Sequence, residues 1–485
     1  METIILALFT LLSKSLGLIR DILLADNFGA TYVTDVFIIS ITLPVVLLES
    51  ISSAVLVNYI PIISKIKSEK KEKEIGDFNG ILLAVIITVI TAGVVLFCLW
   101  GQPFLHLFAL GFEGEKFQLL FKFSKITIFA AYFIILGDIF KAHCQQMGRF
   151  YSTAISSIIV NITVIVGIYL SEFNDMFIVY AFLVGNLFTF CVLAIDARRC
   201  KIQIKLNMNF HNIHLKKILF LSAPIILNNA IWEINGIIDT SLVSTLGDGY
   251  VTSLNYANKI TSIVVGIATA SIATVVYPKY ARVANDKVQI KNFLKKDLKK
   301  MSKLLCPICV FCVLKADAIV NLVFANNNFS DEILNVVITS FRIYSMGMFF
   351  SCIKVVLFKY YYAQQNTKIP AQNTVIAIIV NIVLNIILIR FLGYQGVVIA
   401  TVISSVLTVM LLSLKIDGFE VTSYVKGAFL IALYITISIL IIICLNVVLI
   451  NVQGIMGTFI FGGSFVFIYL IYFAIRDRDV LQFKK

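Results

Sequence analysis

The chain has 485 residues, of which 59% are hydrophobic and only 14% are charged. A water-soluble protein of this length exposes far more charge, so the composition excludes a soluble enzyme or soluble binding protein and predicts a polytopic membrane protein. The formal net charge of +13 is concentrated in the loops 65–73, 198–217 and 279–303. Such loops are expected on the cytoplasmic side, so the charge is a topology signal and does not indicate nucleic-acid binding.

Hydrophobic runs of about 20 residues predict an all-α protein that crosses the membrane fourteen times. Basic residues follow every second run, whereas the other connections are short and mostly acidic. The positive-inside rule therefore places both termini in the cytoplasm. The runs lie near 2–24, 32–63, 79–101, 118–145, 151–171, 175–196, 216–245, 250–278, 302–325, 332–363, 370–391, 394–414, 424–450 and 454–475.

An internal repeat divides the chain into two similar halves. The segment GATYVTD at 29–35 has a counterpart, GDGYVTS, at 247–253, and IIVNI occurs at both 158–162 and 378–382. Six helices per half give both halves the same orientation, which is the plan of transporters whose halves rock about a central site. The predicted domains are a six-helix lobe at 1–197, a cytoplasmic linker at 198–217, a second six-helix lobe at 218–415, and two further helices with a tail at 416–485.

The first two predicted helices contain ionisable residues that a lipid-facing helix does not tolerate. A charge at the centre of a membrane helix costs about 2.5–3.5 kcal/mol on the lenient insertion scale. The residues are Lys14, Arg20, Asp21, Asp35 and Glu49. They predict a polar cavity with a ligand, with Lys14 and Asp21 on one face of the helix and Arg20 about a third of a turn away. Arg20 and Asp21 as interfacial anchors are the alternative.

The second half has its own intramembrane polar residues. Asn381 and Asn385 are four residues apart and share a helix face. Buried amides usually link helices, but beside Asp239 and Thr401 they would offer hard oxygen ligands to a small cation. Lys315 and Asp317 are expected to pair near a helix end, and the nine cysteines are expected to be buried free thiols with no disulfide framework and no zinc site.

Soluble-enzyme signatures are absent from the sequence: it has no Walker A, GxSxG, HExxH or GxGxxG motif. Transport without a nucleotide site must use an ion gradient, the membrane potential or the gradient of the substrate. A membrane-embedded glycan ligase or polymerase is the rival from another class. Such enzymes carry a large outer loop, and the longest outer connection here, near 102–118, is too short for one.

Two stretches resemble the MurJ (MviN-type) lipid II flippase family. SKSLGLIRDILLADNFGATYVTDVFIISITLP at 13–44 is similar to the family pattern S-R-x-x-G-x-x-R-D, F-G, T-D-A-F and L-P-N. YYYAQQNTKIPAQNTVIAIIVNIVLNIILIRFLGYQGVVIAT at 360–401 is similar to Y-A-x-x-D-T-x-x-P followed by V-N-x-x-L-N and a G-x-x-G-x-A-x-A-T turn. The resemblance covers essentially the whole chain and implies fourteen helices, arranged as two lobes and two additional helices.

The resemblance implies a central cavity for the pyrophosphate of an undecaprenyl-linked precursor. Its substrate-binding residues would be Lys14, Arg20, Asp21, Asp35 and Lys259, and its sodium site would comprise Asp239, Asn381, Asn385, Val397 and Thr401. The chain departs from the family pattern in three places. Two cavity arginines are lysines, which lose the bidentate fork; an arginine pair is absent near Glu49; and Asn385 replaces a carboxylate.

The expected function is therefore a flippase that moves a lipid-linked saccharide, with lipid II favoured, to the outer leaflet by alternating access. A flippase for an O-antigen or capsule repeat unit and a multidrug–cation antiporter of the same superfamily remain alternatives. The expected setting is a bacterial cell membrane, with membrane lipids and the cell-wall synthesis machinery as partners. Resetting would use cation binding, with sodium as the candidate ion, or the membrane potential. No other cofactor is expected, and the protein is expected not to be an enzyme.

Overall fold

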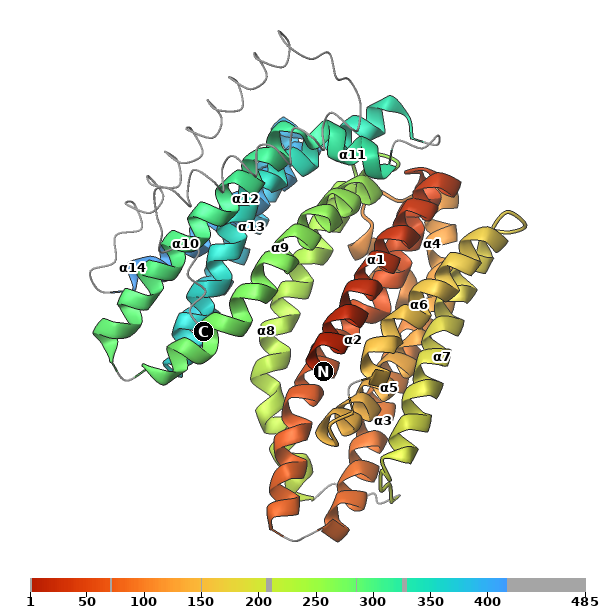
Figure 1. Ribbon diagram of the computed structural model, residues 1–485. Helices are drawn as coiled ribbons and strands as arrows, with labels where there is room; N and C mark the ends of the chain where they lie inside the picture. Colours follow the sequence, from red (N-terminus) through yellow and green to blue (C-terminus); the bar gives the residue numbers. More distant parts are fainter. Residues whose placement is uncertain are drawn as a thin grey trace. The chain divides into compact units, whose positions relative to one another are not determined.

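The structure is a computed structural model that describes residues 2–69, 72–149, 151–205, 212–284, 286–324 and 329–416. These residues form long α-helices and no β-strand, which confirms the all-α class (Figure 1). The helices are α1 (Glu2–Phe28), α2 (Tyr32–Ser68), α3 (Glu72–Phe108), α4 (Gly114–Thr127), α5 (Ala130–Gln146), α6 (Tyr151–Leu170), α7 (Met176–Arg199), α8 (Ile213–Ser244), α9 (Tyr250–Arg282), α10 (Lys287–Leu314), α11 (Ala316–Phe324), α12 (Asp331–Ala363), α13 (Lys368–Leu392) and α14 (Tyr394–Leu414).

These helices do not correspond one to one with the predicted spans. The spans expected near 118–145 and 302–325 are each divided into two helices, α4 with α5 and α10 with α11. The spans expected near 424–450 and 454–475 lie outside the described residues. The total of fourteen spans therefore stays a prediction.

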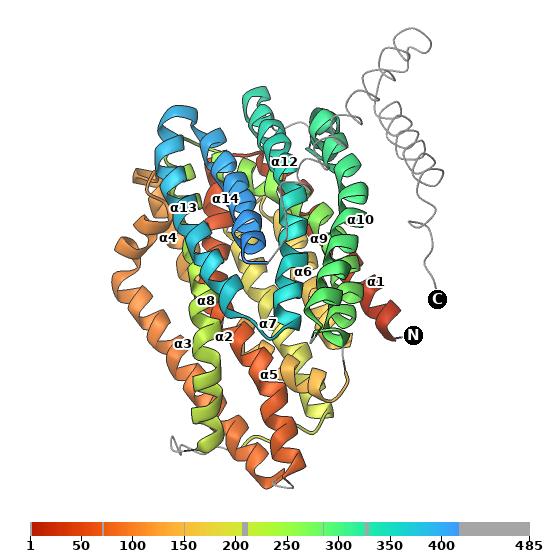
Figure 2. The same cartoon turned by 90° about the vertical axis from the view of Figure 1, so that its left-hand side faces the viewer.

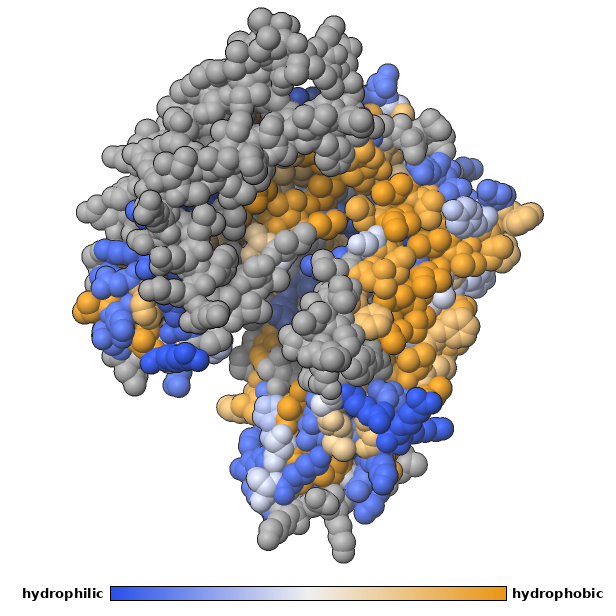
Figure 3. Space-filling view, in the orientation of Figure 1, coloured by the Kyte–Doolittle hydropathy of each residue, from blue (hydrophilic) through white to orange (hydrophobic). Residues whose placement is uncertain are grey.

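Within the described part of the chain, six helical segments are long and apolar enough to cross a membrane. The bent pair α10–α11 makes a seventh if it is one span. In Figure 3 an apolar band crosses α6 and α7, and hydrophilic residues gather beyond it at the lower end of this part of the molecule. The protein is a multi-pass membrane protein. The six segments are α3, α4 with α5, α7, α12, α13 and α14.

The chain divides into two compact units, Met1–Thr252 and Ser253–Lys485. The division falls in the first turn of α9, so α8 belongs to the first unit, where it packs against α2 and α3 (Figure 2). The predicted lobe boundary at 198–217 rests on the sequence repeat and stays a prediction.

Inside the first unit α1 packs on α6, α6 on α7, and α7 on α5, while α2 packs on α4, α5 and α8. Inside the second unit α12 packs against α10 and α14, and α13 packs against α14. Five of the predicted site residues are buried within these units: Asp21, Asp35, Asn381, Asn385 and Val397.

Buried polar contacts fix one end of the first unit. The Tyr59 side chain on α2 is fully buried; its hydroxyl donates to Asn79 Oδ1 (2.9 Å) and lies 3.2 Å from His143 Nδ1. Asn79 in turn donates to the Gln203 carbonyl (2.8 Å), and the Lys205 N–H donates to the Gly76 carbonyl (2.9 Å). The segment that follows α7 is thereby attached to α3.

Candidate functional site

Arg20 lies on α1 eight residues before its end, about 12 Å along the helix axis. Its Nε and Nη2 both donate to Asp21 Oδ1, at 3.1 and 2.8 Å, and its Nη1 donates to Asn161 Oδ1 on α6 at 3.1 Å. The Asp21 side chain is only 4% exposed and that of Arg20 is 17% exposed. A guanidinium has five N–H groups, so two remain that no described residue accepts.

The contact between α1 and α6 supports this guanidinium. Asn161 also donates to the Ser13 carbonyl (3.3 Å), and the Ser13 and Ser157 hydroxyls lie 2.5 Å apart. A Cβ added at Gly17 would lie 3.7 Å from Asn161 Nδ2, so α6 passes close to α1 there. Asn161 is the asparagine of the first IIVNI copy, so the repeat marks a residue that orients Arg20.

Lys14 also lies on α1, and its side chain is exposed. It forms no ion pair with any of the residues that the structure describes. An exposed ammonium on an apolar helix is available to an anionic group, since nothing in the described part of the protein neutralises it.

Asp35 has a structural role in this molecule. It lies in the first turn of α2 and is fully buried. Its Oδ2 accepts the Gly249 N–H (2.7 Å), and its Oδ1 accepts the Thr252 N–H (2.7 Å) and the Thr252 hydroxyl. Asp35 therefore caps α9 from another helix, which satisfies N–H groups that the first turn leaves without partners and places a negative charge at the positive end of the helix dipole. These bonds give Asp35 a structural role, and its predicted role in substrate binding stays a prediction.

The two copies of the GATYVTD-type segment touch each other at this cap. Gly249 adopts a positive φ of 81°, and a Cβ there would lie 2.2 Å from the Ala30 carbonyl oxygen, so only glycine fits. Gly29 also has a positive φ, of 63°, and its N–H donates to the Ala25 carbonyl at the end of α1. Lys116 pairs with Asp248 beside the cap.

Four of the five residues predicted to bind sodium lie on α13 and α14 of the second unit. Asn385 Nδ2 donates to Asn381 Oδ1 (3.2 Å), and both side chains are buried. Thr401 donates to the Val397 carbonyl (3.1 Å). The helices are antiparallel neighbours: Ser404 on α14 bonds to the Ala377 carbonyl, and Gly396 lies against Leu388. This register sets the Asn381–Asn385 segment opposite the Val397–Thr401 segment.

Asp239 and Lys259 belong to different units. Asp239 lies on α8 in the first unit, half-buried, and its Oδ2 accepts a hydrogen bond from Asn235 Nδ2 (3.3 Å). Lys259 lies on α9 in the second unit and is half-buried. The donors on α13 and α14, like the Asp239 carboxylate, are hard oxygen ligands of the kind that a small cation requires.

One ion pair and three groups of cysteines were not predicted from the sequence. Asp317 pairs with Arg342 of α12 (2.7 Å), a partner that the sequence did not predict, and the pair is exposed. The sequence also contains two overlapping CxxC spacings, at 306–312, that the interpretation of the cysteines as scattered thiols missed. A third group, Cys144 and Cys200 with Asp196, is brought together only by the packing of α5 on α7.

Comparison with known proteins identifies relatives along almost the whole chain. The family model of the lipid II flippase MurJ matches residues 24–471. The probable lipid II flippase MurJ of Buchnera aphidicola subsp. Acyrthosiphon pisum is 25% identical over 465 residues, which cover 94% of this chain and 91% of that protein. The lipid II flippase MurJ of Thermosipho africanus is 26% identical over 428 residues, which cover 88% and 87%.

Solved structures agree with these relatives. The lipid II flippase MurJ in an inward closed conformation matches with a TM-score of 0.86 at 26% identity, covering 99% of this chain and 100% of that chain. An inward-facing multidrug resistance MATE transporter matches with a TM-score of 0.70 at 12% identity, covering 85% and 96%, and shows the fold alone. The resemblance found in the sequence is confirmed, and the chain belongs to the lipid II flippase MurJ family.

Proposed function

We propose that this chain is a flippase that moves lipid II from the cytoplasmic to the outer leaflet of a bacterial cell membrane by alternating access. The observation that carries the proposal is the match of the lipid II flippase family model to residues 24–471. We place both termini in the cytoplasm, treat the protein as a transporter and not an enzyme, and expect the cell-wall synthesis machinery to be its neighbour.

Arg20 is the residue that we assign to the pyrophosphate. Asp21 and Asn161 hold its guanidinium with three hydrogen bonds, which fixes the orientation of the group before any ligand arrives. One N–H group of Nη1 and one of Nη2 remain, and a guanidinium with two N–H groups to offer can bind two oxygens of a phosphate at once. Preorganisation of this kind lowers the entropic cost of binding.

Lys14 supplies a second positive charge on the same helix, and Lys259 stays a predicted third. A lysine binds phosphate as a point charge without fixed geometry. We therefore expect Arg20 to set the position of the pyrophosphate and the lysines to compensate its charge, while the lipid chain remains in the bilayer.

Growth rescue in cells depleted of their own lipid II flippase tests the Arg20 assignment. We expect Arg20→Ala to lose rescue, because each charge-assisted hydrogen bond is worth about 1.5–3 kcal/mol, which corresponds to about a ten- to hundredfold loss of substrate affinity. Arg342→Ala is the matched control, since Arg342 also pairs with a carboxylate, Asp317, but lies on α12. Full rescue by Arg20→Ala contradicts the assignment.

Loss of Arg20 also removes the cation that lies against the buried Asp21 carboxylate, and removal of one partner from a buried ion pair destabilises a protein. The double variant Arg20→Ala/Asp21→Asn removes the negative charge as well. We expect it to insert and accumulate as the natural chain does and still to fail in rescue. A double variant that restores growth would assign Arg20 to stability and not to the substrate.

We propose sodium as the coupling ion, with Asp239 and the oxygen donors of α13 and α14 as its ligands. When bound, sodium supplies positive charge that the neutral amides of this chain do not. Asp239→Asn should abolish the sodium-dependent rise in unfolding temperature and weaken the sodium dependence of transport, whereas Asn385→Asp should strengthen both. Responses of Asp239→Asn that equal those of the natural chain across a sodium titration would remove this site.

A flippase for an O-antigen or capsule repeat unit stays the nearest alternative. The lysines in place of two arginines and the missing arginine pair are departures from the lipid II flippase pattern among residues expected to contact the substrate. Transport assays with lipid II and with a capsule or O-antigen precursor, run with the same purified chain in vesicles, separate them. Movement of the second precursor alone would reassign the substrate, and sugar transfer without movement of lipid would reassign the class.

A further inference from the structure

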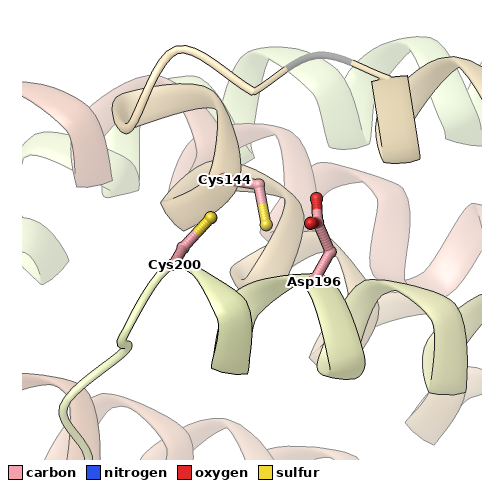
Figure 4. A group of neighbouring side chains, drawn as sticks. All are labelled: Cys144, Asp196 and Cys200. Atoms are coloured by element: carbon pink, nitrogen blue, oxygen red, sulfur yellow. The ribbon is translucent and has the colours of Figure 1, made fainter.

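Cys144, Asp196 and Cys200 form a three-residue cluster at the end of α5 and α7. The two sulfurs and a carboxylate oxygen all lie within 4.8 Å of one another, and Figure 4 shows the three side chains converging. Cys144 is fully buried, Cys200 is 6% exposed and the Asp196 side chain is 15% exposed. The cluster is separate from Arg20 and Lys14, the residues proposed to bind the lipid-linked substrate, because those two lie on α1.

The local structure builds this cluster from two helix ends. Asp196 and Cys200 are four residues apart at the end of α7, and the Cys200 N–H donates to the Asp196 carbonyl (2.9 Å), so both side chains leave one face of the helix. Cys144 comes from the last turn of α5, and its carbonyl accepts the Arg149 N–H (2.9 Å). The turn that follows α5 brings Arg149 Nη1 to 2.9 Å from Asp196 Oδ1.

We propose that Cys144, Cys200 and Asp196 bind a zinc ion, with water as the fourth ligand. Zinc takes tetrahedral sets of thiolate and carboxylate ligands at about 2.3 and 2.1 Å, and tetrahedral geometry at these lengths sets neighbouring sulfurs about 3.8 Å apart. The ligand atoms lie within 4.8 Å of one another, and zinc binding would require side-chain rotations that bring the two sulfurs to this spacing. Both thiols release their protons to solvent when the metal binds.

With zinc bound and both thiols deprotonated, the charges of the cluster balance. Two thiolates and one carboxylate carry three negative charges, and Arg149 and a zinc ion together carry three positive ones. Arg149 also orients the carboxylate, as outer partners of metal ligands do. A cytoplasmic disulfide between Cys144 and Cys200 is the competing outcome; it would need an oxidising compartment, and basic loops such as 198–217 are expected on the reducing cytoplasmic side.

The ion would stabilise the start of the segment that follows α7. The Ile202 N–H donates to the Ala197 carbonyl, and the Lys205 N–H donates to the Gly76 carbonyl on α3. Cys200 lies directly before these contacts, so a metal bond to its sulfur would join α5, α7 and this segment. The ion therefore has a structural role, and transport chemistry is not routed through it.

The test uses the full chain in detergent, stripped with a chelator, kept reduced with a phosphine, and titrated with Co²⁺. We expect one equivalent per chain with a thiolate-to-cobalt absorption band, which Zn²⁺ displaces. Cys144→Ser and Cys200→Ser should lose the band, and Arg149→Ala should weaken the affinity about ten- to hundredfold. Cys191→Ser is the matched control, because Cys191 is an exposed thiol on the same helix as Asp196.

A second variant keeps the test decisive if a serine variant fails to fold. Asp196→Cys adds a third thiolate and should raise the intensity of the band by about half, since that intensity scales with the number of thiolate ligands. The proposal is overturned if the natural chain shows no band, if the band persists in Cys200→Ser and is therefore due to other thiols, or if the freshly purified chain holds a Cys144–Cys200 disulfide.

Discussion

Replacement of Asp35 by asparagine tests whether this carboxylate holds the start of α9. Asparagine has nearly the same volume but only one acceptor oxygen, so it presents an NH₂ group to one of the two backbone N–H groups that Asp35 now accepts. The Gly249 and Thr252 N–H groups cannot both keep their 2.7 Å bonds. The perturbation is therefore confined to the cap.

The magnitude follows from the hydrogen bonds that are lost. A hydrogen bond to a charged group contributes about 1.5–3 kcal/mol, and a buried donor left without an acceptor costs about 1–3 kcal/mol. These overlapping contributions give a local destabilisation of about 2–4 kcal/mol, which corresponds to a roughly 30- to 900-fold change in the opening equilibrium.

Hydrogen–deuterium exchange of the backbone amides at 249–252 is the assay, because exchange reports local opening. Asp35→Asn should accelerate exchange there by the factor above. Thr252→Val removes only the hydroxyl bond, worth about 1 kcal/mol, and should accelerate exchange about fivefold. Asp138→Asn, an equal change of charge on α5, should leave these amides unchanged. Unaltered exchange in Asp35→Asn would refute the capping role.

Two further substitutions test other contacts of the first unit. Gly249→Ala places a methyl group 2.2 Å from the Ala30 carbonyl oxygen at a positive φ. Strain of this kind costs about 1–3 kcal/mol, so the unfolding temperature in detergent should fall. An unchanged unfolding temperature would disprove the close approach. Tyr59→Phe leaves Asn79 Oδ1 without its 2.9 Å donor and should destabilise the chain by about 1–3 kcal/mol, measured by the same melt; equal stability would mean that water replaces the hydroxyl.

The sequence predicted most of the fold because span length and hydrophobicity are local properties. A bilayer requires about 20 apolar residues per helix, and every predicted span inside the described residues is helical. The two breaks that divide spans, near 128–129 and at Lys315, were not predicted. An apolar run has the same hydrophobicity whether its helix is continuous or broken, so packing decides the break.

The candidate site was predicted in part. Helical periodicity placed Arg20 and Asp21 on different faces of the helix, yet the two side chains pair at 2.8 Å. Periodicity describes only the directions of the Cβ atoms, and the long arginine side chain extends beyond the direction of its Cβ atom. Asp35 was identified as an unusual intramembrane acid, but its partners lie 214 and 217 residues further along the chain. No local pattern reveals such a partner. The cysteine pair of α5 and α7 was missed for the same reason.

The cap at Asp35 has a mechanical consequence for studies of this transporter. The first turn of α9 is fastened to the first unit, whereas the rest of the helix, from Ser253 on, belongs to the second. The hydrogen bonds to Asp35 therefore hold the first turn of α9 against α2. Distances from its first turn to labels on α2 should stay constant through a transport cycle, so this point can serve as the fixed origin against which the motion of the Lys279 end is measured.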